Sequence, residues 1–306
     1  MALKDLIPLG MSLPHRSPDP LVLTTVAAVA RRAEALGFAD LWVTENTNDH
    51  VSSFDPVVIL TYAAAITTRI RLGASVIVLP IHHPVMLAHQ WATLDFISGG
   101  RAILAAGLGR DHHFRDFQVP GDARVTRFRE QIALLRALWT QDKVSYSGKI
   151  YQIENVSLGQ KPARTSGIPL WMGVGHPDAV RRAARLSDGW MGAGGSTAAD
   201  FRAAVPILKQ ALESAGRDPT HFPISKRVFM AVDERPGVAH AELDRWFTEV
   251  YHNPAGTSAA GIHGTPEQVA DQLHALVHAG ANHLLLNPIS RHAEQLEAVA
   301  ELTGLK

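Results

Sequence analysis

The sequence contains no cysteine, which excludes catalytic thiols, thiolate metal sites and disulfide bonds. It also has no excess of charge of either sign, because 29 Lys and Arg residues balance 29 Asp and Glu residues. Since nucleic-acid binding needs a clustered basic surface, we expect no nucleic-acid partner. No apolar run reaches the roughly 18 to 20 residues of a membrane span, and early prolines interrupt any signal-peptide pattern. These absences indicate a cytoplasmic protein without a membrane partner.

Metal-binding and dinucleotide-binding motifs are also missing. The chain has 16 histidines, but neither of the adjacent pairs, His82-His83 and His112-His113, can point both its rings into one site from a strand. The spacings H-x-H and H-E-x-x-H do not occur, so we expect no metal site. No G-x-G-x-x-G turn follows the first expected strand, which argues against a dinucleotide-binding fold.

Apolar segments alternate with helical patterns along the whole chain. With 46% hydrophobic and 19% charged residues, its 306 residues can form a large core. Eight apolar segments are expected to be strands, at about 6–13, 38–43, 71–79, 102–108, 168–172, 189–191, 224–232 and 283–286. Strict alternation of strands and helices implies a parallel sheet with right-handed crossovers. Eight such units predict a closed eight-fold β/α (TIM) barrel.

We expect one barrel domain, 1–306, with three insertions. They are predicted at about 111–126, 143–165 and 238–264. The middle one should contain a hairpin outside the main sheet, around Ser147-Gly148. The other two are candidate lids over an active site. Their aromatic residues suggest an apolar pocket, although core packing explains aromatic residues equally well: Phe114, Phe117, Trp246 and Phe247.

Helix boundaries are predicted from capping residues. Thr24 is expected to cap the first helix, and Gly37 to end it. Asp55 and Thr265 are each followed by proline, which favours the first position of a helix.

The stretch from Arg69 to Gly109 reads as strand, loop, helix, tight turn and strand. Both of its strands end in residues suited to a binding site. In a β/α barrel the active site forms at the C-terminal ends of the strands. This rule selects Glu45, Asn46, Ser75, Arg110, His112, His113, the loops that begin at Gly173 and Gly192, and Asn287.

Two glycine-rich loops follow expected strands. The first, Gly173-Val174-Gly175-His176, leads into a helix N-terminus, where backbone N–H groups and the helix dipole favour a phosphate group. The alternative is a tight β–α loop whose glycines need positive φ. The second loop, Gly192-Ala193-Gly194-Gly195, could widen the same pocket or be a flexible loop.

Glu45 and Arg110 each have two interpretations. Glu45 could accept a proton or hydrogen-bond a ring nitrogen, or it could form a salt bridge in the barrel rim. Arg110 could hold an anion or stabilise developing negative charge, or it could pair with Asp111 or Asp116.

The order and spacing of several motifs resemble the bacterial luciferase-like flavin oxidoreductases. The motifs run nearly end to end: ALGFADLWV (35–43), TTRIRLG (67–73), PV (84–85), ATLD (92–95), SGGR (98–101), LRALW (135–139), KP (161–162), DGW (188–190) and GTPEQV (264–269). The resemblance implies an eight-fold barrel that binds reduced FMN or coenzyme F420, with the ring at the barrel mouth and the phosphate among backbone amides.

The resemblance also implies roles for particular residues. Ser75-Val76 falls where many members have a bulge and a non-proline cis peptide against the ring. The stretch from Gly107 through Gly109 to His113 would form the wall facing substrate. The phosphate loop would consist of Gly173, Val174, Gly175 and His176.

Two positions depart from the family pattern. Members commonly have a histidine where this chain has Asn46, and asparagine cannot shuttle a proton. Some F420-dependent members have a proton-donating glutamate where this chain has Arg110, which argues against a sugar-phosphate dehydrogenase of that type. His113, or alternatively His112, is the candidate replacement donor.

The resulting hypothesis is an FMN- or F420-dependent oxidoreductase, by monooxygenation or hydride transfer, that acts on a small organic substrate. Glu45 favours FMN, whereas Leu108-Gly109-Arg110 and the GTPEQ motif favour F420, so both cofactors remain open. The alternatives are a non-catalytic flavin-binding relative and a metal-dependent barrel hydrolase. The resemblance further implies a homodimer, through the helices after strands two and three, and a separate flavin or F420 reductase that supplies the reduced cofactor.

Overall fold

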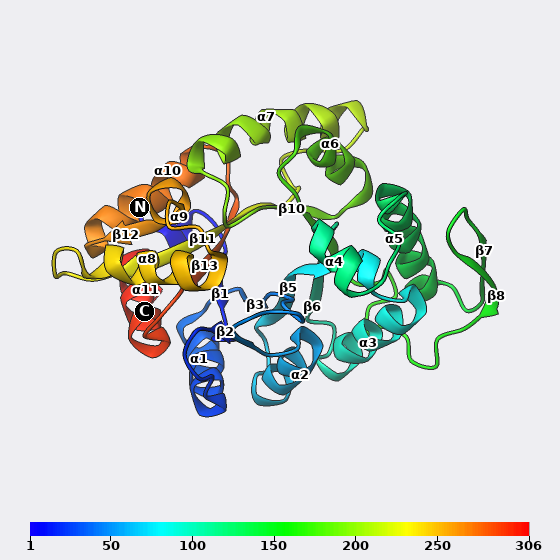
Figure 1. The fold of residues 1–306 in the computed structure, drawn as a ribbon, viewed down its shortest axis with the longest axis horizontal. Helices are drawn as coiled ribbons and strands as arrows, with labels where there is room; N and C mark the ends of the chain where they lie inside the picture. Colours follow the sequence, from blue (N-terminus) through cyan, green and yellow to red (C-terminus); the bar gives the residue numbers. More distant parts are fainter. Residues whose placement is uncertain (306) are drawn as a thin grey trace.

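The computed structural model describes residues 1–305 and folds them around a closed barrel of parallel strands (Figure 1). Within that range the barrel strands are β1 (Leu9–Ser12), β3 (Asp40–Val43), β5 (Arg71–Val78), β6 (Ala102–Gly107), β9 (Leu170–Gly173), β10 (Gly189–Gly192), β11 (Ile224–Val232) and β13 (His283–Pro288). They pair in the order β10-β9-β6-β5-β3-β1-β13-β11, and β10 also pairs with β11, which closes the ring. The predicted eight-fold β/α barrel is confirmed.

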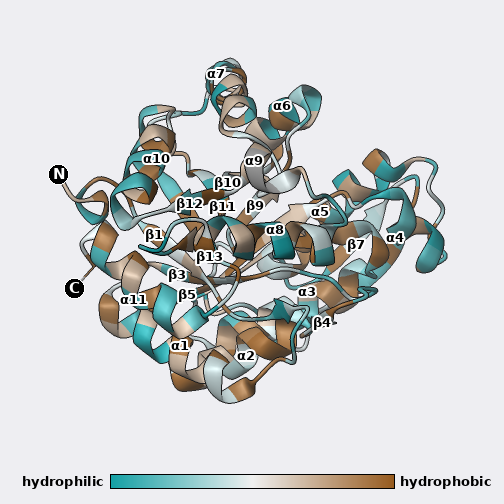
Figure 2. Cartoon of the chain, turned by 60° about the vertical axis from the view of Figure 1, so that its left-hand side comes forward, coloured by the Kyte–Doolittle hydropathy of each residue, from teal (hydrophilic) through white to brown (hydrophobic). Residues whose placement is uncertain are grey.

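Helices surround this barrel (Figure 1). They are α1 (Leu23–Leu36), α2 (Pro56–Ile66), α3 (Pro84–Ile97), α5 (Arg124–Thr140), α6 (Pro177–Leu186), α7 (Ala198–Ser214), α10 (Pro266–His278) and α11 (His292–Thr303). Helices α1 and α11 pack side by side, and Figures 1 and 2 both show the start of the chain on the same side of the molecule as α11.

Most of the predicted helix boundaries are confirmed. The Asp55 carboxylate accepts a hydrogen bond from the N–H of Val58 at 3.0 Å, and Thr265 caps α10 in the same way. Gly37 ends α1 with φ of 90°. The prediction for Thr24 is wrong, because α1 begins earlier, at Leu23, and has no side-chain cap.

The remaining elements lie before β1 or in the connections between barrel strands and helices. They are the short helices η1 (Leu3–Asp5), η2 (Leu79–Ile81), α4 (Asp111–Asp116) and α9 (Gly256–Ala260), the longer helix α8 (Val238–Tyr251), and the strands β2 (Arg16–Ser17), β4 (Ser52–Ser53), β7 (Val144–Ser147), β8 (Gln152–Val156) and β12 (Ile262–Gly264). Strands β7 and β8 form an antiparallel hairpin in a sheet of their own, as predicted. Figure 1 shows this hairpin projecting from the body.

Two tryptophans fill the interior of the barrel. The ring centroids of Trp42 and Trp171 are 5.4 Å apart, and both side chains are almost completely buried. A Cβ atom at Gly73 or Gly10 would lie inside the van der Waals envelope of the Trp42 ring. Glycine on the neighbouring strands is therefore what makes room for an indole in the barrel centre.

A buried carboxylate, Asp40, holds Trp42 in place. Its oxygens accept hydrogen bonds from Trp42 Nε1, from Arg71 at 2.6 Å and from His283 Nε2 at 3.0 Å. Burial alone would raise the pKa of Asp40, but the charge of His283, its hydrogen bond and Arg71 outweigh this effect and lower the pKa to about 2. The other ring nitrogen of His283 lies 2.7 Å from the hydroxyl of Ser225 on β11. This network ties four barrel strands together.

Exposed apolar side chains occur on α2 and α3. Val58 is 69% exposed, Met86 59%, Phe96 56% and Ile97 53%. Figure 2 shows apolar residues along both helices. Within residues 1–305, no helix has the length and apolar character that a membrane span requires.

Gly73→Ala should lower the free energy of unfolding by about 1–3 kcal/mol, because the new methyl group overlaps the Trp42 ring in a closely packed interior. Urea unfolding followed by tryptophan fluorescence measures this change. Gly159→Ala is the matched control, since a Cβ atom there meets no heavy atom within 4 Å. Equal stability of the two variants would show that the barrel interior can accommodate the added methyl group.

Candidate active site

The C-terminal half of β5 carries a backbone irregularity in the wall of the barrel mouth. The Ser75–Val76 peptide is cis, and the pairing of β5 with β6 shifts register between Ser75 and Ile77. The Val76 side chain packs on the interior cluster, where a Cβ atom at Gly107 or Gly173 would collide with its methyl groups. The bulge and cis peptide implied by the family resemblance therefore occur at the expected residues, and the two glycines accommodate Val76.

Glu45 holds this bulge from the neighbouring strand. Its backbone N–H donates to the Val76 carbonyl oxygen at 3.3 Å, and its Oε2 accepts from the N–H of Val78 at 2.6 Å. The other oxygen lies 2.6 Å from His82 Nε2. Only 8% of Glu45 is exposed. Because both oxygens are engaged, the geometry favours a salt bridge in the rim over a free general base.

Asn46 is oriented by a chain of hydrogen bonds from His15. The Nδ1–H of His15 donates to the Leu13 carbonyl at 2.7 Å, so its Nε2 accepts from the N–H and hydroxyl of Thr44. The Thr44 hydroxyl in turn accepts from Asn46 Nδ2 at 2.6 Å. Burial lowers the pKa of His15 to about 3, which keeps this histidine neutral. The chain thus fixes the direction of the Asn46 amide.

His113 and Arg110 lie at the start of α4. The Nδ1 of His113 accepts a hydrogen bond from the N–H of Arg110 at 3.0 Å, which leaves the proton of the neutral ring on Nε2. Burial, together with the adjacent His112, lowers the pKa of His113. Near pH 7 this ring is therefore a neutral hydrogen-bonding group.

The Arg110 side chain is exposed and does not form either of the ion pairs considered from the sequence. Asp111 pairs with Arg124 at 2.8 Å, and Asp116 pairs with Arg115 at 2.6 Å. The alternative interpretation, in which Arg110 pairs with one of these carboxylates, is wrong.

The loop after β9 leads directly into α6. Neither Gly173 nor Gly175 has positive φ, so the positive φ expected in the alternative explanation of this loop is not present. His176 caps α6 through its Nδ1, 3.3 Å from the N–H of Asp178. Among the described residues, no hydrogen-bond acceptor meets the N–H groups of Gly175 or His176. These free donors, at the positive end of a helix, suit an anion.

The second glycine loop is held by Lys226 of β11. The Lys226 ammonium donates to the carbonyl oxygens of Ala193 and Ser196 and to the Ser196 hydroxyl. Burial lowers the pKa of Lys226 to about 7. The loop is therefore anchored from the neighbouring strand.

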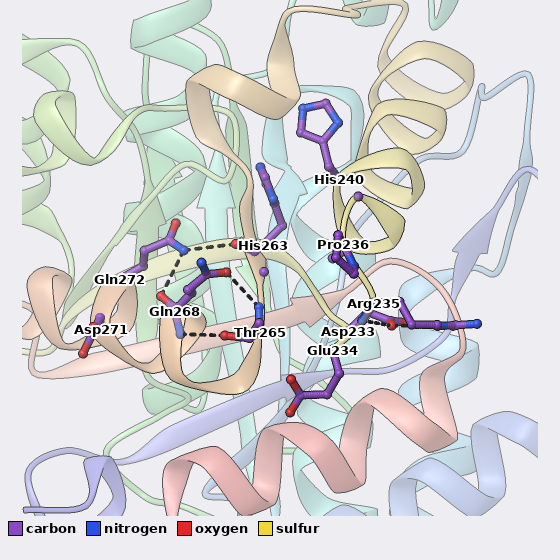
Figure 3. A pocket seen from close by; sticks show the side chains of 13 residues that line it. Asp233, Glu234, Arg235, Pro236, His240, His263, Thr265, Gln268, Asp271 and Gln272 are labelled. Atoms are coloured by element: carbon purple, nitrogen blue, oxygen red, sulfur yellow. Dashed lines mark hydrogen bonds and ion pairs between the residues drawn. The ribbon is translucent and has the colours of Figure 1, made fainter.

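A cavity of about 670 Å³ lies elsewhere, between the ends of β11 and β12 and the first turns of α8 and α10 (Figure 3). The rings of His240 and His263, which both line it, pack edge to face with their centroids 4.9 Å apart, and Gln268 is engaged in capping α10. Asp233 pairs with Arg235 and with Arg291. No predicted site residue lines this cavity. Within residues 1–305, no group of three or more His, Asp or Glu side chains could hold a metal ion.

Sequence reasoning missed two residues near the mouth, His15 and Arg227. Arg227 lies on β11 and donates to Asn287. Two adjacent charges, Lys226-Arg227, inside a strand that is otherwise apolar were a signal that could have identified it. His15 follows the first strand directly, at a position that the strand-end rule also covers.

Comparison with known proteins places this geometry in a family. Residues 7–283 match the family described as luciferase-like monooxygenase. The F420-dependent glucose-6-phosphate dehydrogenase of Kineococcus radiotolerans is 27% identical, over 72% of this chain and 68% of its own. The 5,10-methylenetetrahydromethanopterin reductase of Methanopyrus kandleri is 25% identical, over 92% of this chain and 93% of its own.

A solved structure shares the fold. An F420-dependent secondary alcohol dehydrogenase, in complex with an F420-acetone adduct, superposes with a TM-score of 0.86 at 18% identity and covers 98% of both chains.

Glu45→Ala should lower the free energy of unfolding by about 2 kcal/mol, because a buried carboxylate that accepts two hydrogen bonds is lost. Urea unfolding measures the change. The control is Glu213→Ala, at an exposed carboxylate on α7 that should change stability by less than about 0.5 kcal/mol. If Glu45→Ala were as stable as the control, Glu45 would not be what holds the bulge.

Proposed function

Because this chain belongs to the luciferase-like monooxygenase family, we propose that it is an oxidoreductase that uses a reduced flavin-type cofactor on a small organic substrate. The observation that carries the proposal is the Ser75–Val76 bulge, which lies in the mouth between Gly107 and Gly173. We further propose F420 in preference to FMN, because the Kineococcus relative and the solved structure described above are both named as F420-dependent. A separate reductase supplying the reduced cofactor is part of the proposal.

The residues present fit such a cofactor. Val76 offers an apolar surface backed by two glycines, against which a flat ring can lie. The free N–H groups of Gly175 and His176 would bind a phosphate at the start of α6. Burial, followed by Arg129 on α5 and Arg185 on α6, lowers the pKa of Arg182 on α6 and outweighs the opposite effect of Asp178, so positive charge predominates here. Such charge favours an anionic cofactor tail.

When bound, a reduced cofactor of this kind would supply two electrons, either as hydride to a substrate or, in the case of FMN, by reducing oxygen. The protein residues would orient the reactants and manage protons. Asn46 is a fixed hydrogen-bonding group, and His113 can donate from Nε2 while neutral. Arg110 cannot donate a proton, so we do not propose the sugar-phosphate substrate named for the Kineococcus relative.

Titration of the purified protein with F420 and with FMN tests this function. We expect quenching of F420 fluorescence with a Kd of about 1–10 μM and at least about tenfold weaker FMN binding, a difference of about 1.4 kcal/mol. Gly173→Ala should weaken F420 binding about tenfold or more, because its methyl group would displace Val76. Gly159→Ala is the control and should bind normally.

The other outcomes are also informative. Preference for FMN would change the cofactor and leave the reaction class intact. Failure of the wild-type protein to bind either molecule at about 100 μM would reject the oxidoreductase proposal. Tight binding without turnover of any electron acceptor would favour the non-catalytic alternative.

We also propose that the chain forms a homodimer through α2 and α3. The exposed Val58, Met86, Phe96 and Ile97 support this arrangement, because exposed apolar groups of this kind are typical of association surfaces. Sedimentation velocity at about 10 μM should find a dimer that the double variant Val58→Asp/Phe96→Asp converts to a monomer. Leu23→Asp, at an exposed apolar residue of α1, is the control. A wild-type monomer would contradict the proposal.

A further inference from the structure

Strand β11 carries a charged side chain into the barrel interior. Ser225 contacts His283 and Met191, and these side chains lie in the interior beside the two tryptophans. Because side chains alternate along a strand, Arg227 and Phe229 share the inward face with Ser225. The guanidinium of Arg227 therefore lies two residues along β11 from Ser225, closer to the C-terminal mouth of the barrel.

This guanidinium has few acceptors around it. Its Nε and Nη2 both donate to the same oxygen, Oδ1 of Asn287, at 3.0 and 2.6 Å. The Phe229 ring lies 4.6 Å from its Cζ, and Tyr251 is a further hydrogen-bonding partner. Burial lowers the pKa of Arg227, and the charge of Arg16 adds to this effect. Within residues 1–305, no carboxylate forms an ion pair with it.

Two buried arginines show how other guanidinium groups in this chain find hydrogen-bond acceptors or a counter-charge. Arg16 forms an ion pair with Asp49 at 2.5 Å. Arg101 donates to four backbone carbonyls and one hydroxyl, those of Ala64, Thr67, Ile70 and Ser98. Arg227 has fewer acceptors than its five N–H donors can use, yet it keeps some accessible surface. A buried charge without a counter-charge is costly unless a ligand supplies one.

The position of Arg227 indicates which ligand would do so. In the ring of strands, β11 is the fourth strand from β5 in either direction, so Arg227 and Val76 lie on opposite walls of the mouth. Aromatic rings pack behind Arg227, where Phe229 and Phe247 are buried and Tyr251 is partly exposed. The Phe229 ring centroid is 5.4 Å from those of Phe247 and Tyr251. With the cofactor against Val76, the molecule between the two walls is the substrate.

We propose that Arg227, held by Asn287, binds an oxyanion of the substrate, which is therefore a small organic carboxylate or sulfonate with an apolar body. A guanidinium matches the planar, paired oxygens of such a group, and the partly exposed ring of Tyr251 offers an apolar surface to the rest of the molecule. The assignment of this anion as the substrate rests on the proposed function, whereas the existence of an anion-binding site at Arg227 does not.

Binding of simple probes tests the site without cofactor. Benzoate and benzenesulfonate are the anionic probes, with benzamide as the neutral isostere, and calorimetric titration measures their affinity. We expect at least one anion to bind the wild-type protein with Kd below about 10 mM and about tenfold or more tightly than benzamide. If neither anion binds, or if benzamide binds equally well, the proposal is overturned.

Asn287→Asp is the sharpest variant, because it preserves shape and places a carboxylate on Arg227. The internal ion pair should raise the urea midpoint of unfolding and weaken binding of the anionic probe about tenfold or more, with benzamide unaffected. Arg227→Gln should weaken anion binding to the same extent. Arg31→Gln, an exposed arginine on α1, is the control and should bind as the wild type does. Anion affinity within twofold of wild type in Asn287→Asp would overturn the proposal.

F420 and FMN titrations of the same variants separate substrate from cofactor. The proposal expects cofactor affinity to be unchanged within about threefold. If Asn287→Asp weakens cofactor binding but not anion binding, the guanidinium of Arg227 binds the cofactor and not the substrate, and the proposal is overturned. Failure of the wild-type protein to bind either cofactor would count against the proposed function alone, because the anion is measured without cofactor.

Discussion

The buried carboxylate of Asp40 is the interaction on which the barrel interior depends. It bonds Trp42 on its own strand, Arg71 on β5 and His283 on β13, and these partners outweigh the effect of its burial. Trp42 is thereby held against the glycines of the neighbouring strands. Together with Trp171 it fills the barrel interior beneath the C-terminal mouth. Only the C-terminal end of the strands remains open to ligands, which is why all the candidate residues lie there.

The wall of that mouth depends on contacts between neighbouring strands. Val76 points inward because the register of β5 shifts at this residue, and Gly107 and Gly173 leave it space. Glu45 bonds the backbone on both sides of the bulge, at Val76 and at Val78. Its carboxylate is thus committed to shaping the surface. Glu45 is a candidate proton acceptor because of its position at a strand end, but in the structure it stabilises the backbone of the bulge.

The difference between what could and could not be predicted follows from the range of the interactions. Apolar runs and capping residues are local signals, so the eight strands and the caps at Asp55 and Thr265 could be read directly. The role of Glu45 arises from contacts with residues more than 30 positions away, and the hydrogen-bond chain from His15 to Asn46 spans a similar distance. A charged residue in a mostly apolar strand, such as Arg227, can be recognised as unusual from the sequence. That its hydrogen bonds go to Asn287 and not to a carboxylate is seen only in the folded barrel.

The charges of the mouth favour anions throughout. Glu45 is occupied, His113 is neutral near pH 7, and Asn46 carries no charge. The positive groups are the exposed Arg110, Arg227, and the start of α6, although the first turn of α6 also carries Asp178. Such a mouth stabilises negative charge on bound molecules, and the carboxylate of Glu45 is already hydrogen-bonded rather than free as a proton source. In the proposed reaction, protons would therefore come from hydrogen-bonded neutral groups or from water, and negative charge that develops on the reactants would be balanced by fixed positive groups on both walls.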